Sequence, residues 1–395
     1  MKVLVLGVGM QGKAALHDLA SSLEVGDIVA ADVDIDMLES YVQRHGWAGR
    51  VRCERLDASD PAALSRLLSI RPDVAIDLLP TAFIDRVASA AIEHGVHLVN
   101  TFYVSKRLKD LDENARRRGV TILPEFGLDP GIDLVMLGEA HRSLDTIEEI
   151  HSYGAGIPEL EAADNPLRYK VSWTFDGVLE TYRRPARAIR QGTLVEFDRT
   201  HLFSSENVHQ VDVAGLGALE AYPNDDVVQY VEALGLDVGS LRAAGRYTMR
   251  WPGHCAFWKS LVDLHLLDLE PVIVDGRPVD RARFLAAAVG PHIQYAPGER
   301  DVVVVRVDVA GRKAGKPCRL RYELLDRRDL ATGLSAMSRT VGFTASIGAS
   351  MVARGMLPGP GVLSPVRDVP YQPMVDELGR RGIRVSREEI GVRDA

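Results

Sequence analysis

The chain has 395 residues, of which 46% are hydrophobic and 26% are charged, and ordinary domain sizes predict two domains, or at most three, at this length. A net charge of −8 argues against nucleic acid and anionic membranes as partners. The three cysteines have no CxxC spacing, which argues against a disulfide framework or a zinc site. No apolar run approaches the roughly 20 residues of a membrane span. We therefore expect a cytoplasmic protein with no membrane segment and no bound metal.

The first 130 residues alternate short apolar runs with amphipathic segments. Strands are predicted at Val3–Leu6, Asp27–Asp32, Val51–Leu56, Val74–Leu79, Val96–Val99 and Val120–Pro124. Helices are expected between them, the first over Gly12–Leu23 and the second over Met37–His45. This alternation is typical of βαβ units and a parallel sheet.

A different pattern follows Gly131. Strands are predicted at Glu149–Gly156, Tyr169–Phe175, Tyr247–Trp251, Ser260–Asp268, Val302–Val309 and Cys318–Leu325. The last two are joined by GRKAGKP and predict an antiparallel hairpin. Helical patterns return at Thr344–Arg354 and Met374–Arg381, so we expect the chain to re-enter the first domain.

A GxGxxG motif follows the first predicted strand and opens the first predicted helix. Such glycines allow a tight turn, close approach of the backbone to a pyrophosphate, and close packing of helix on strand. The N-terminus of the helix offers N–H groups to the phosphates. The loop is therefore predicted to bind a dinucleotide through Gly7, Val8, Gly9, Met10, Gln11 and Gly12.

Asp32 stands 20 residues after Gly12, at the end of the second predicted strand. A carboxylate at this position accepts hydrogen bonds from the adenosine ribose. Asp34 follows it, and no arginine lies within 33–36 to pair with a 2′-phosphate. We therefore predict NAD rather than NADP.

Two further strand ends hold candidate cofactor contacts, because open parallel sheets bind ligands at the carboxyl ends of their strands. Asp57 and Ala58 follow the third predicted strand and are expected near the adenine, although Asp57 equally fits a helix cap. Leu78, Leu79 and Pro80 follow the fourth strand and are expected beside the nicotinamide half.

Several longer stretches resemble the saccharopine dehydrogenase family, which includes lysine 6-dehydrogenases. They are TFYVS (101–105), EFGLDPGID (125–133), AGIPELEAADNPLRYKVSWTFDG (155–177), RYTMRWPGHCAFWKSL (246–261) and, in support, SRTVGFTASIG (338–348). The resemblance covers nearly the whole chain. GLDPGID and NPLRYKVSW resemble saccharopine reductases, whereas MKVLVLGVGMQGK, ADVD and GHCAFWK followed by LVDL resemble lysine 6-dehydrogenases.

The resemblance implies an α/β fold. It consists of a Rossmann-type doubly wound parallel sheet formed by residues 1–130 and 340–395, with an inserted α+β substrate and dimerisation domain over 131–339. It also implies NAD(P)-dependent chemistry at a C–N bond of an amino acid or amine. We expect oxidative deamination like that of L-lysine 6-dehydrogenase. The alternatives are saccharopine-type reductive condensation of an amine with a keto acid or aldehyde, and a non-catalytic dinucleotide-binding protein.

Site residues follow from the matching motifs. The resemblance implies cofactor contacts at Thr101, Leu128, Pro130 and Ser172. It implies substrate contacts at Phe102, Tyr103, Tyr247, Thr248 and Arg250.

Two positions depart from the saccharopine reductase pattern. Asp225 replaces the arginine of PNRDS, which grips a substrate carboxylate, and Phe102 replaces the first serine of TSYVS. A carboxylate cannot hold another carboxylate. We therefore predict that Asp225, together with Asp226, favours a cationic substrate such as lysine or a diamine.

Amine oxidation needs a base that titrates near the operating pH. His254 follows a predicted strand and a Pro-Gly turn and is the first candidate, with packing as the alternative. Lys259 is the second, with a solvated helix position as the alternative. Asp129 is expected to orient the substrate nitrogen or to cap the helix near Gly131. One of Lys170 and Arg250 is expected to bind an α-carboxylate, with exposed charges on strands as the equal alternative.

The partners predicted are a small amino acid or amine substrate and a second copy of the chain. The strands of the inserted domain can extend a sheet across a two-fold axis, so we expect a homodimer.

Overall fold

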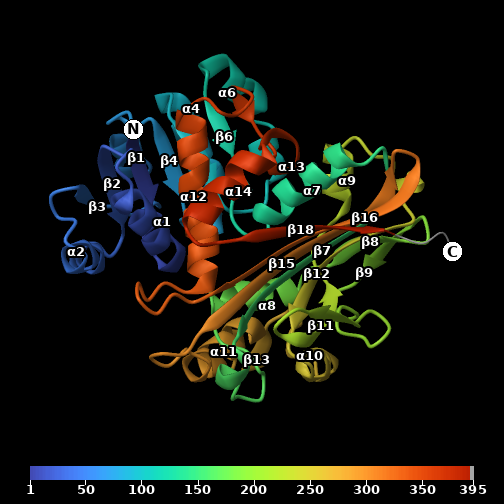
Figure 1. Ribbon diagram of the computed structural model, residues 1–395. Coiled ribbons are helices and arrows are strands. Elements are labelled where there is room, and N and C mark those ends of the chain that lie inside the picture. The colour runs from blue at the N-terminus through green and yellow to red at the C-terminus, as the bar shows by residue number, and fades with distance from the viewer. Residues whose placement is uncertain (392–395) are drawn as a thin grey trace. The chain divides into compact units, whose positions relative to one another are not determined.

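The computed structural model describes residues 1–391 (Figure 1). The chain divides into two compact units. The first contains Met1–Glu139 and Ser338–Ile383, and the second contains Ala140–Met337 and the segment from Arg384. Within residues 1–391, no helix combines the length and apolar character needed to cross a membrane.

The first unit is built on a seven-stranded parallel sheet in the order β17-β6-β5-β4-β1-β2-β3. Its strands are β1 (Lys2–Leu6), β2 (Asp27–Asp32), β3 (Val51–Arg55), β4 (Val74–Asp77), β5 (His97–Asn100), β6 (Thr121–Leu123) and β17 (Gly361–Val362). The strand order reverses between β1 and β4, which makes this pair of strands the switch point where doubly wound sheets bind ligands. The predicted Rossmann-type fold is confirmed.

Helices cover this sheet, which explains why its strands are continuous apolar runs. They are α1 (Met10–Ser21), α2 (Ile35–Arg44), α3 (Pro61–Leu68), α4 (Ile84–His94), α5 (Lys106–Lys109), α6 (Asp112–Arg118), α7 (Ile132–Ser143), α12 (Ala336–Ala353), α13 (Pro365–Asp368) and α14 (Tyr371–Arg380), with a short 3₁₀ turn η1 (Thr81–Phe83). A Cβ on Gly342 would lie 2.5 Å from the carbonyl oxygen of Gln11, so α12 packs closely on α1 (Figure 1). The late helix thus returns to the first unit.

The second unit contains a nine-stranded mixed sheet. Its main path is β10-β11-β12-β7-β15-β16-β18, with β8 paired to β12 and β9 paired to β8. The strands are β7 (Thr146–Pro158), β8 (Ala186–Arg190), β9 (Thr193–Phe197), β10 (His209–Val213), β11 (Gly217–Pro223), β12 (Ala243–Arg250), β15 (Asp301–Lys313), β16 (Lys316–Arg327) and β18 (Val385–Gly391). The strands β15 and β16 form the predicted hairpin, with Val304 opposite Leu325.

The remaining elements of the second unit are helices and a small separate hairpin. They are α8 (Phe175–Tyr182), α9 (Val228–Ala233), α10 (His254–Asp263), α11 (Arg281–Val289), β13 (Val272–Val274), β14 (Arg277–Val279) and 3₁₀ turns at Leu160–Ala162, Val238–Ser240 and Gly290–His292. Aromatic and aliphatic side chains from α8, α10 and α11 share one buried core, which includes Tyr182 and Trp258.

Three sequence predictions are wrong in this unit. Residues 385–391 were assigned to the dinucleotide-binding domain, but they form β18, an edge strand paired with β16. Ser260–Asp268 is not a strand, because His254, Trp258 and Val262 are buried at four-residue spacing and continue the helix α10. Tyr169–Phe175 is not a strand, because Thr174 ends this segment as the N-cap of α8.

Candidate active site

The glycine-rich loop joins β1 to α1 at the carboxyl edge of the first sheet. Gly7 has φ of +85°, and a Cβ there would lie 2.8 Å from the carbonyl oxygen of Leu78. A Cβ on Gly12 would lie 2.1 Å from the carbonyl oxygen of Gly7. In contrast, a Cβ on Gly9 would meet no atom within 4 Å. Gly7 and Gly12 are therefore required by packing, and Gly9 leaves room for a ligand.

The N-terminus of α1 is suited to an anion. Gly9 is its N-cap, no side chain caps it, and its first turn contains no acidic residue. The first N–H groups and the positive end of the helix dipole therefore remain available to a phosphate. Met10 is 42% exposed at this end of the helix, whereas Val8 is buried.

Asp32 is fixed beside this loop by two backbone hydrogen bonds. Its Oδ2 accepts from the Val8 N–H at 2.6 Å, and its Oδ1 accepts from the Asp34 N–H at 3.0 Å. Arg55, which the sequence analysis did not select, is the register partner of Asp32 on β3 and is exposed. A carboxylate and a guanidinium group thus lie at neighbouring strand ends where the ribose is expected.

Asp57 is exposed after β3, and its Oδ1 accepts from both the N–H and the hydroxyl of Ser59. These bonds lower the pKa of Asp57. The next helix, α3, is capped by Asp60, so the alternative role of Asp57 as its cap is wrong. Ala58 is buried, and both residues remain predicted adenine contacts.

The ends of β4 and β5 hold two buried polar side chains that the sequence analysis missed. Asp77 and Asn100 are register partners and have no solvent exposure. Their Oδ1 atoms accept from the N–H groups of Leu79 and Phe102, whereas Oδ2 of Asp77 and Nδ2 of Asn100 have no hydrogen-bond partner. Burial raises the pKa of Asp77 to about 7. The sequence signal for Asp77 is an acidic residue at the end of a buried apolar run, as in VAID (74–77).

We expect Asp77→Asn to stabilise the protein in a pH-dependent way. In the unfolded chain this carboxyl ionises near pH 4, but in the folded chain only near pH 7, so the parent loses stability as pH rises between these values. Asparagine keeps the acceptor for Leu79 and carries no charge. The variant's advantage in free energy of unfolding should therefore grow by on the order of 4 kcal/mol from pH 4 to pH 8.

Urea unfolding at several pH values measures this difference. Asp57→Asn is the control, because the pKa of Asp57 is lowered and its loss should cost stability at pH 8 rather than add it. An advantage for Asp77→Asn that is the same at pH 4 and pH 8 would contradict the assignment.

The motif GLDPG forms a tight loop beyond β6. The Gly127 N–H donates to the Pro130 carbonyl at 3.0 Å, and a Cβ on Gly131 would lie 2.2 Å from the Gly127 carbonyl oxygen. The side chain of Thr101 approaches Gly127 from the end of β5. The loop therefore lies next to the end of β5, and cofactor contacts of Thr101, Leu128 and Pro130 stay a prediction.

Asp129 and its neighbours differ in burial. Asp129 is half-buried, whereas Leu128 and Pro130 are buried. The Gly131 N–H donates to the side chain of Asp133 at the start of α7. A substrate contact for Asp129 stays a prediction. Phe102 packs against the core beneath α3 and α4, so part of its role is structural. Tyr103 is half-buried beside it.

In the second unit, Arg250 is a buried cation without a carboxylate partner. It ends β12 and is 6% exposed. Its guanidinium lies 5.3 Å from the ring centre of Tyr169, and the hydroxyls of Tyr182 and Tyr222 are within its electrostatic range. Nη1 donates to the Met249 carbonyl, but Nε has no hydrogen-bond partner. Among residues 1–391, no carboxylate forms an ion pair with Arg250 within 4 Å.

Other buried donors near Arg250 also lack partners. They are the hydroxyl of Tyr295, and the hydroxyls of Tyr169 and Ser172, which have no partner other than each other. Ser172 lies beside Tyr169, and its Oγ would be 3.2 Å from a Cβ on Gly156. Buried polar groups are nearly always paired. A cluster of unpaired donors around a guanidinium therefore indicates a missing acceptor, such as a substrate carboxylate.

His254 is buried, and both of its ring nitrogens are hydrogen-bonded. Nδ1 lies 3.2 Å from the Leu167 carbonyl and must donate to it, so Nε2 accepts from the Tyr182 hydroxyl at 2.9 Å. Burial, and then the charge of Arg250, lowers the pKa of His254 to about 3. These contacts favour the packing alternative for His254 over its predicted role as a base.

The two lysine candidates are already paired. Lys259 forms an ion pair with Asp263 one turn later on α10, which favours the alternative of a solvated helix position over a catalytic role. Lys170 is buried, and its Nζ lies 2.7 Å from Glu299 and 3.1 Å from Asp164. Of the two predicted carboxylate binders, only Arg250 is without a carboxylate.

Residues of β12 point alternately to opposite faces of the sheet. Thr248 shares the face of Arg250. Tyr247 points to the other face, where its ring centre lies 5.1 Å from that of Tyr153 in a separate core. The prediction that Tyr247 contacts the same substrate as Thr248 and Arg250 is therefore wrong.

Asp225 and Asp226 are both compensated by arginines. Asp225 lies 3.5 Å from Arg246, and Asp226 forms an ion pair with Arg187. Two paired carboxylates do not create a negative field for a substrate. The predicted preference for a cationic substrate therefore loses its physical basis.

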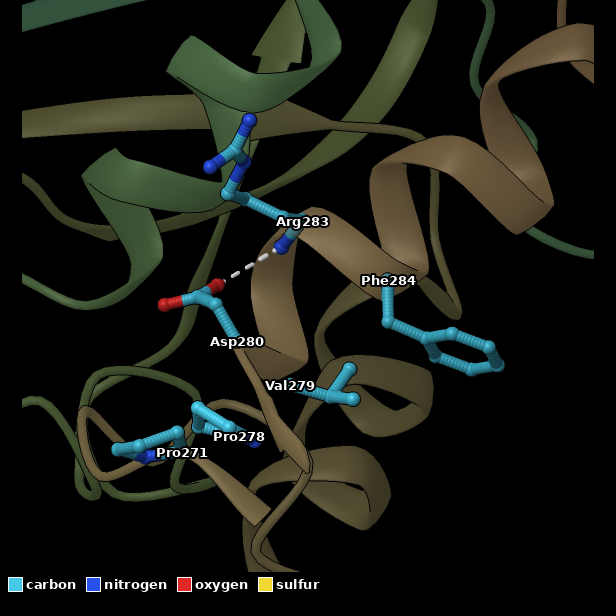
Figure 2. Close-up of a pocket in the computed structure, with 6 residues that line it drawn as sticks. All are labelled: Pro271, Pro278, Val279, Asp280, Arg283 and Phe284. Atoms are coloured by element: carbon cyan, nitrogen blue, oxygen red, sulfur yellow. Dashed lines mark hydrogen bonds between the residues drawn. The ribbon is translucent and has the colours of Figure 1, made fainter. Parts of the chain in front are cut away.

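A hollow of about 540 Å³ lies elsewhere in the second unit (Figure 2). Its lining contains none of the predicted site residues and consists of Pro271, Pro278, Val279, Asp280, Arg283 and Phe284. Asp280 caps α11 by accepting from the Arg283 N–H. Within residues 1–391, no group of His, Cys, Asp and Glu side chains is placed to hold a metal ion.

Comparison with known proteins decides the family. The model of the saccharopine dehydrogenase NADP binding domain matches residues 3–123, and that of the saccharopine dehydrogenase C-terminal domain matches residues 127–383. The chain belongs to the saccharopine dehydrogenase family. The predicted resemblance is confirmed, and so is the prediction of a dinucleotide-dependent oxidoreductase.

Curated relatives match over nearly the whole chain. The L-glutamate-forming, NADP(+) saccharopine dehydrogenase of Schizosaccharomyces pombe is 27% identical over 98% of this chain and 99% of its own length. The mitochondrial alpha-aminoadipic semialdehyde synthase of Bos taurus is 26% identical over 97% of this chain, which spans 47% of that protein.

Solved structures share the fold. The apo L-glutamate-forming saccharopine dehydrogenase of Saccharomyces cerevisiae has a TM-score of 0.85 at 24% identity and covers 99% of this chain and 100% of its own. The homospermidine synthase of Legionella pneumophila, in complex with NAD, has a TM-score of 0.61 at 13% identity and covers 99% and 92%.

Proposed function

We propose that this enzyme joins an amine to a keto acid or aldehyde by reducing the imine between them, and catalyses the reverse oxidation of the secondary amine. This was the second reaction that the sequence predicted. The names of the curated relatives favour it over oxidative deamination of lysine. The observation that carries the proposal is Arg250, a buried guanidinium that pairs with no carboxylate among residues 1–391 and lies near the unpaired hydroxyl of Tyr295.

A substrate carboxylate supplies what this cluster lacks. Charge-assisted hydrogen bonds from a guanidinium to a carboxylate are short and strong, and they gain strength where water is excluded. In the first unit, the uncapped N-terminus of α1 can bind a pyrophosphate. The carboxylate of Asp32, held by the Val8 N–H, can accept hydrogen bonds from a ribose. The bound dinucleotide supplies or accepts the hydride. The chain's own residues hold the dinucleotide and the substrate carboxylate.

The reaction is tested by mixing the purified enzyme with reduced dinucleotide and pairs of amines and carbonyl compounds. The amines are lysine, ornithine and diamines, and the carbonyl compounds are keto acids and aldehydes. We expect oxidation of the dinucleotide only when both substrates are present. Reduction of NAD⁺ by lysine alone, with release of ammonia, would instead establish oxidative deamination.

We infer that the preferred dinucleotide is NAD. The backbone bonds to Asp32 fix its carboxylate, and its remaining lone pairs can accept the two ribose hydroxyls. Asp34 adds a second negative charge that disfavours a 2′-phosphate. The family model and the relatives carry NADP in their names, and Arg55 lies at the adjacent strand end. Arg55 would have to outweigh the two carboxylates of Asp32 and Asp34 for the enzyme to prefer NADP.

Asp32→Ala should weaken NADH binding by about 1–3 kcal/mol, because it removes acceptors for the ribose hydroxyls, and should leave NADPH binding equal or stronger. Fluorescence titration of both dinucleotides measures this. Arg55→Ala is the matched variant at the adjacent strand end and should change neither affinity strongly. If Arg55→Ala abolishes NADPH binding and Asp32→Ala leaves NADH binding unchanged, the enzyme prefers NADP.

A further inference from the structure

A strap formed by residues 290–300 lies between α11 and β15. Most of its side chains are exposed, including His292, Gln294 and Pro297. Two side chains point inward. Ile293 is 3% exposed and joins the core of α8 and α10, and the hydroxyl of Tyr295 is buried. Apart from Glu299, which pairs with the buried Lys170, the strap presents the hydroxyl of Tyr295 to the interior of the second unit.

Two tethers hold this strap on the segment that carries Tyr169 and Ser172. On one side of Tyr295, the Val171 N–H donates to the Ile293 carbonyl at 2.9 Å. On the other side, Lys170 binds both carboxylate oxygens of Glu299, at 2.7 and 2.8 Å. Glu299 also accepts from the Ala296 N–H at 2.6 Å. Tyr295 is thus held next to the residues that surround Arg250.

The hydroxyl of Tyr295 and the Nε of Arg250 lack a hydrogen-bond partner, and the hydroxyls of Tyr169 and Ser172 have none other than each other. Burial raises the pKa of Tyr295, so its hydroxyl is protonated at neutral pH and can donate. A purely structural tyrosine would pair its hydroxyl when buried. Its unpaired state indicates an acceptor that arrives with the substrate.

We propose that Tyr295 is a specificity-determining residue that donates a hydrogen bond to the substrate carboxylate bound by Arg250. Lys170 and Glu299 are its positioning residues. The proposal rests on the proposed function and adds to it. The substrate must carry a carboxylate that fits between the guanidinium of Arg250 and the hydroxyl of Tyr295.

Tyr295→Phe tests this directly. The probes are two matched pairs, L-lysine with L-lysinamide and pyruvate with pyruvamide. Their affinities are measured by titration of the dinucleotide-loaded enzyme, and by KM where turnover occurs. We expect the affinity for the probe whose carboxylate binds here to fall roughly 10- to 100-fold, as for loss of a bond to a charged group. Affinity for the matching amide, affinity for the dinucleotide, and the melting temperature should not fall.

Arg250→Gln serves as the reference that separates the proposed role of Tyr295 from the proposed function of the enzyme. If Arg250→Gln loses carboxylate affinity and Tyr295→Phe does not, the role of Tyr295 is overturned and the proposed function stands. If neither variant changes carboxylate affinity, the proposed function itself falls.

The positioning role is tested at Lys170. Lys170→Met should reduce selectivity for carboxylate over amide probes in the same direction as Tyr295→Phe, and Lys170→Arg should restore most of it. If Lys170 is merely structural, Lys170→Met should lower the melting temperature and reduce the affinities for carboxylate and amide probes equally. That result would overturn the positioning role.

Discussion

Arg250→Gln should lower kcat/KM for a carboxylate-bearing substrate by two to three orders of magnitude without lowering the free energy of unfolding. Truncating one partner of a buried, hydrogen-bonded charge pair costs roughly 2–5 kcal/mol of binding, and each 1.4 kcal/mol is about tenfold. Among residues 1–391 no carboxylate pairs with this buried cation, so its removal takes away a desolvation cost. Function and stability should therefore change in opposite directions.

The matched control is Arg183→Gln. Arg183 is as buried as Arg250 and belongs to the same unit, but it forms ion pairs with Glu180 and Asp280. Its replacement leaves those carboxylates without their cation, so the melting temperature should fall while kcat/KM per folded molecule is retained. Steady-state kinetics and thermal unfolding of both variants provide the comparison. Equal loss of stability in the two variants would show that Arg250 is a structural residue.

The features of the first unit that the sequence predicted well are local in the chain. Buried parallel strands are continuous apolar runs, and the glycine spacing directly encodes a turn and a close helix contact. For this reason the six predicted strands and the loop from Gly7 to Gly12 were found. Arg55 was missed because its nearness to Asp32 depends on the register between β2 and β3.

The second unit was predicted less well because its site is assembled from segments distant in sequence. Arg250, Tyr169, Tyr182 and Tyr295 come from four different parts of the chain. The role of His254 depends on Tyr182 and Leu167, which are hydrogen-bonded to its two ring nitrogens but lie far from it in sequence. Tyr247 was misplaced although the alternation of strand side chains, applied to RYTMR, separates it from Arg250.

The edge strand β18 shows a different limit. Its sequence, VSREEIG, is mostly polar and has no buried face to reveal a strand. It is specified by pairing with β16, where Glu389 lies opposite Leu320 and forms an ion pair with Lys313. Edge strands carry charged residues that discourage further pairing, which also hides them from a pattern based on hydrophobicity.

Gly12→Ala and Gly9→Ala should separate the packing role of the loop from its ligand role. The new Cβ of Gly12→Ala would lie 2.1 Å from the Gly7 carbonyl oxygen, so α1 must move away from β1. Overpacking of this kind costs about 1–3 kcal/mol or more, and the displaced loop should also lose the dinucleotide. The unliganded variant should therefore melt at a lower temperature than the parent and bind NADH at least about 30-fold more weakly, where each 1.4 kcal/mol is about tenfold.

Gly9→Ala should leave the unliganded enzyme as stable as the parent, because its Cβ enters open space and the residue has a negative φ of −69°. The same Cβ occupies the approach to the N-terminus of α1, so NADH affinity should still fall by at least about 30-fold, or roughly 2 kcal/mol. Gly49→Ala, which also meets no atom within 4 Å but lies away from the loop, is the control for both measurements. Normal NADH binding by Gly9→Ala would place the pyrophosphate elsewhere. Equal destabilisation by Gly9→Ala and Gly12→Ala would mean that Gly9 is packed rather than open.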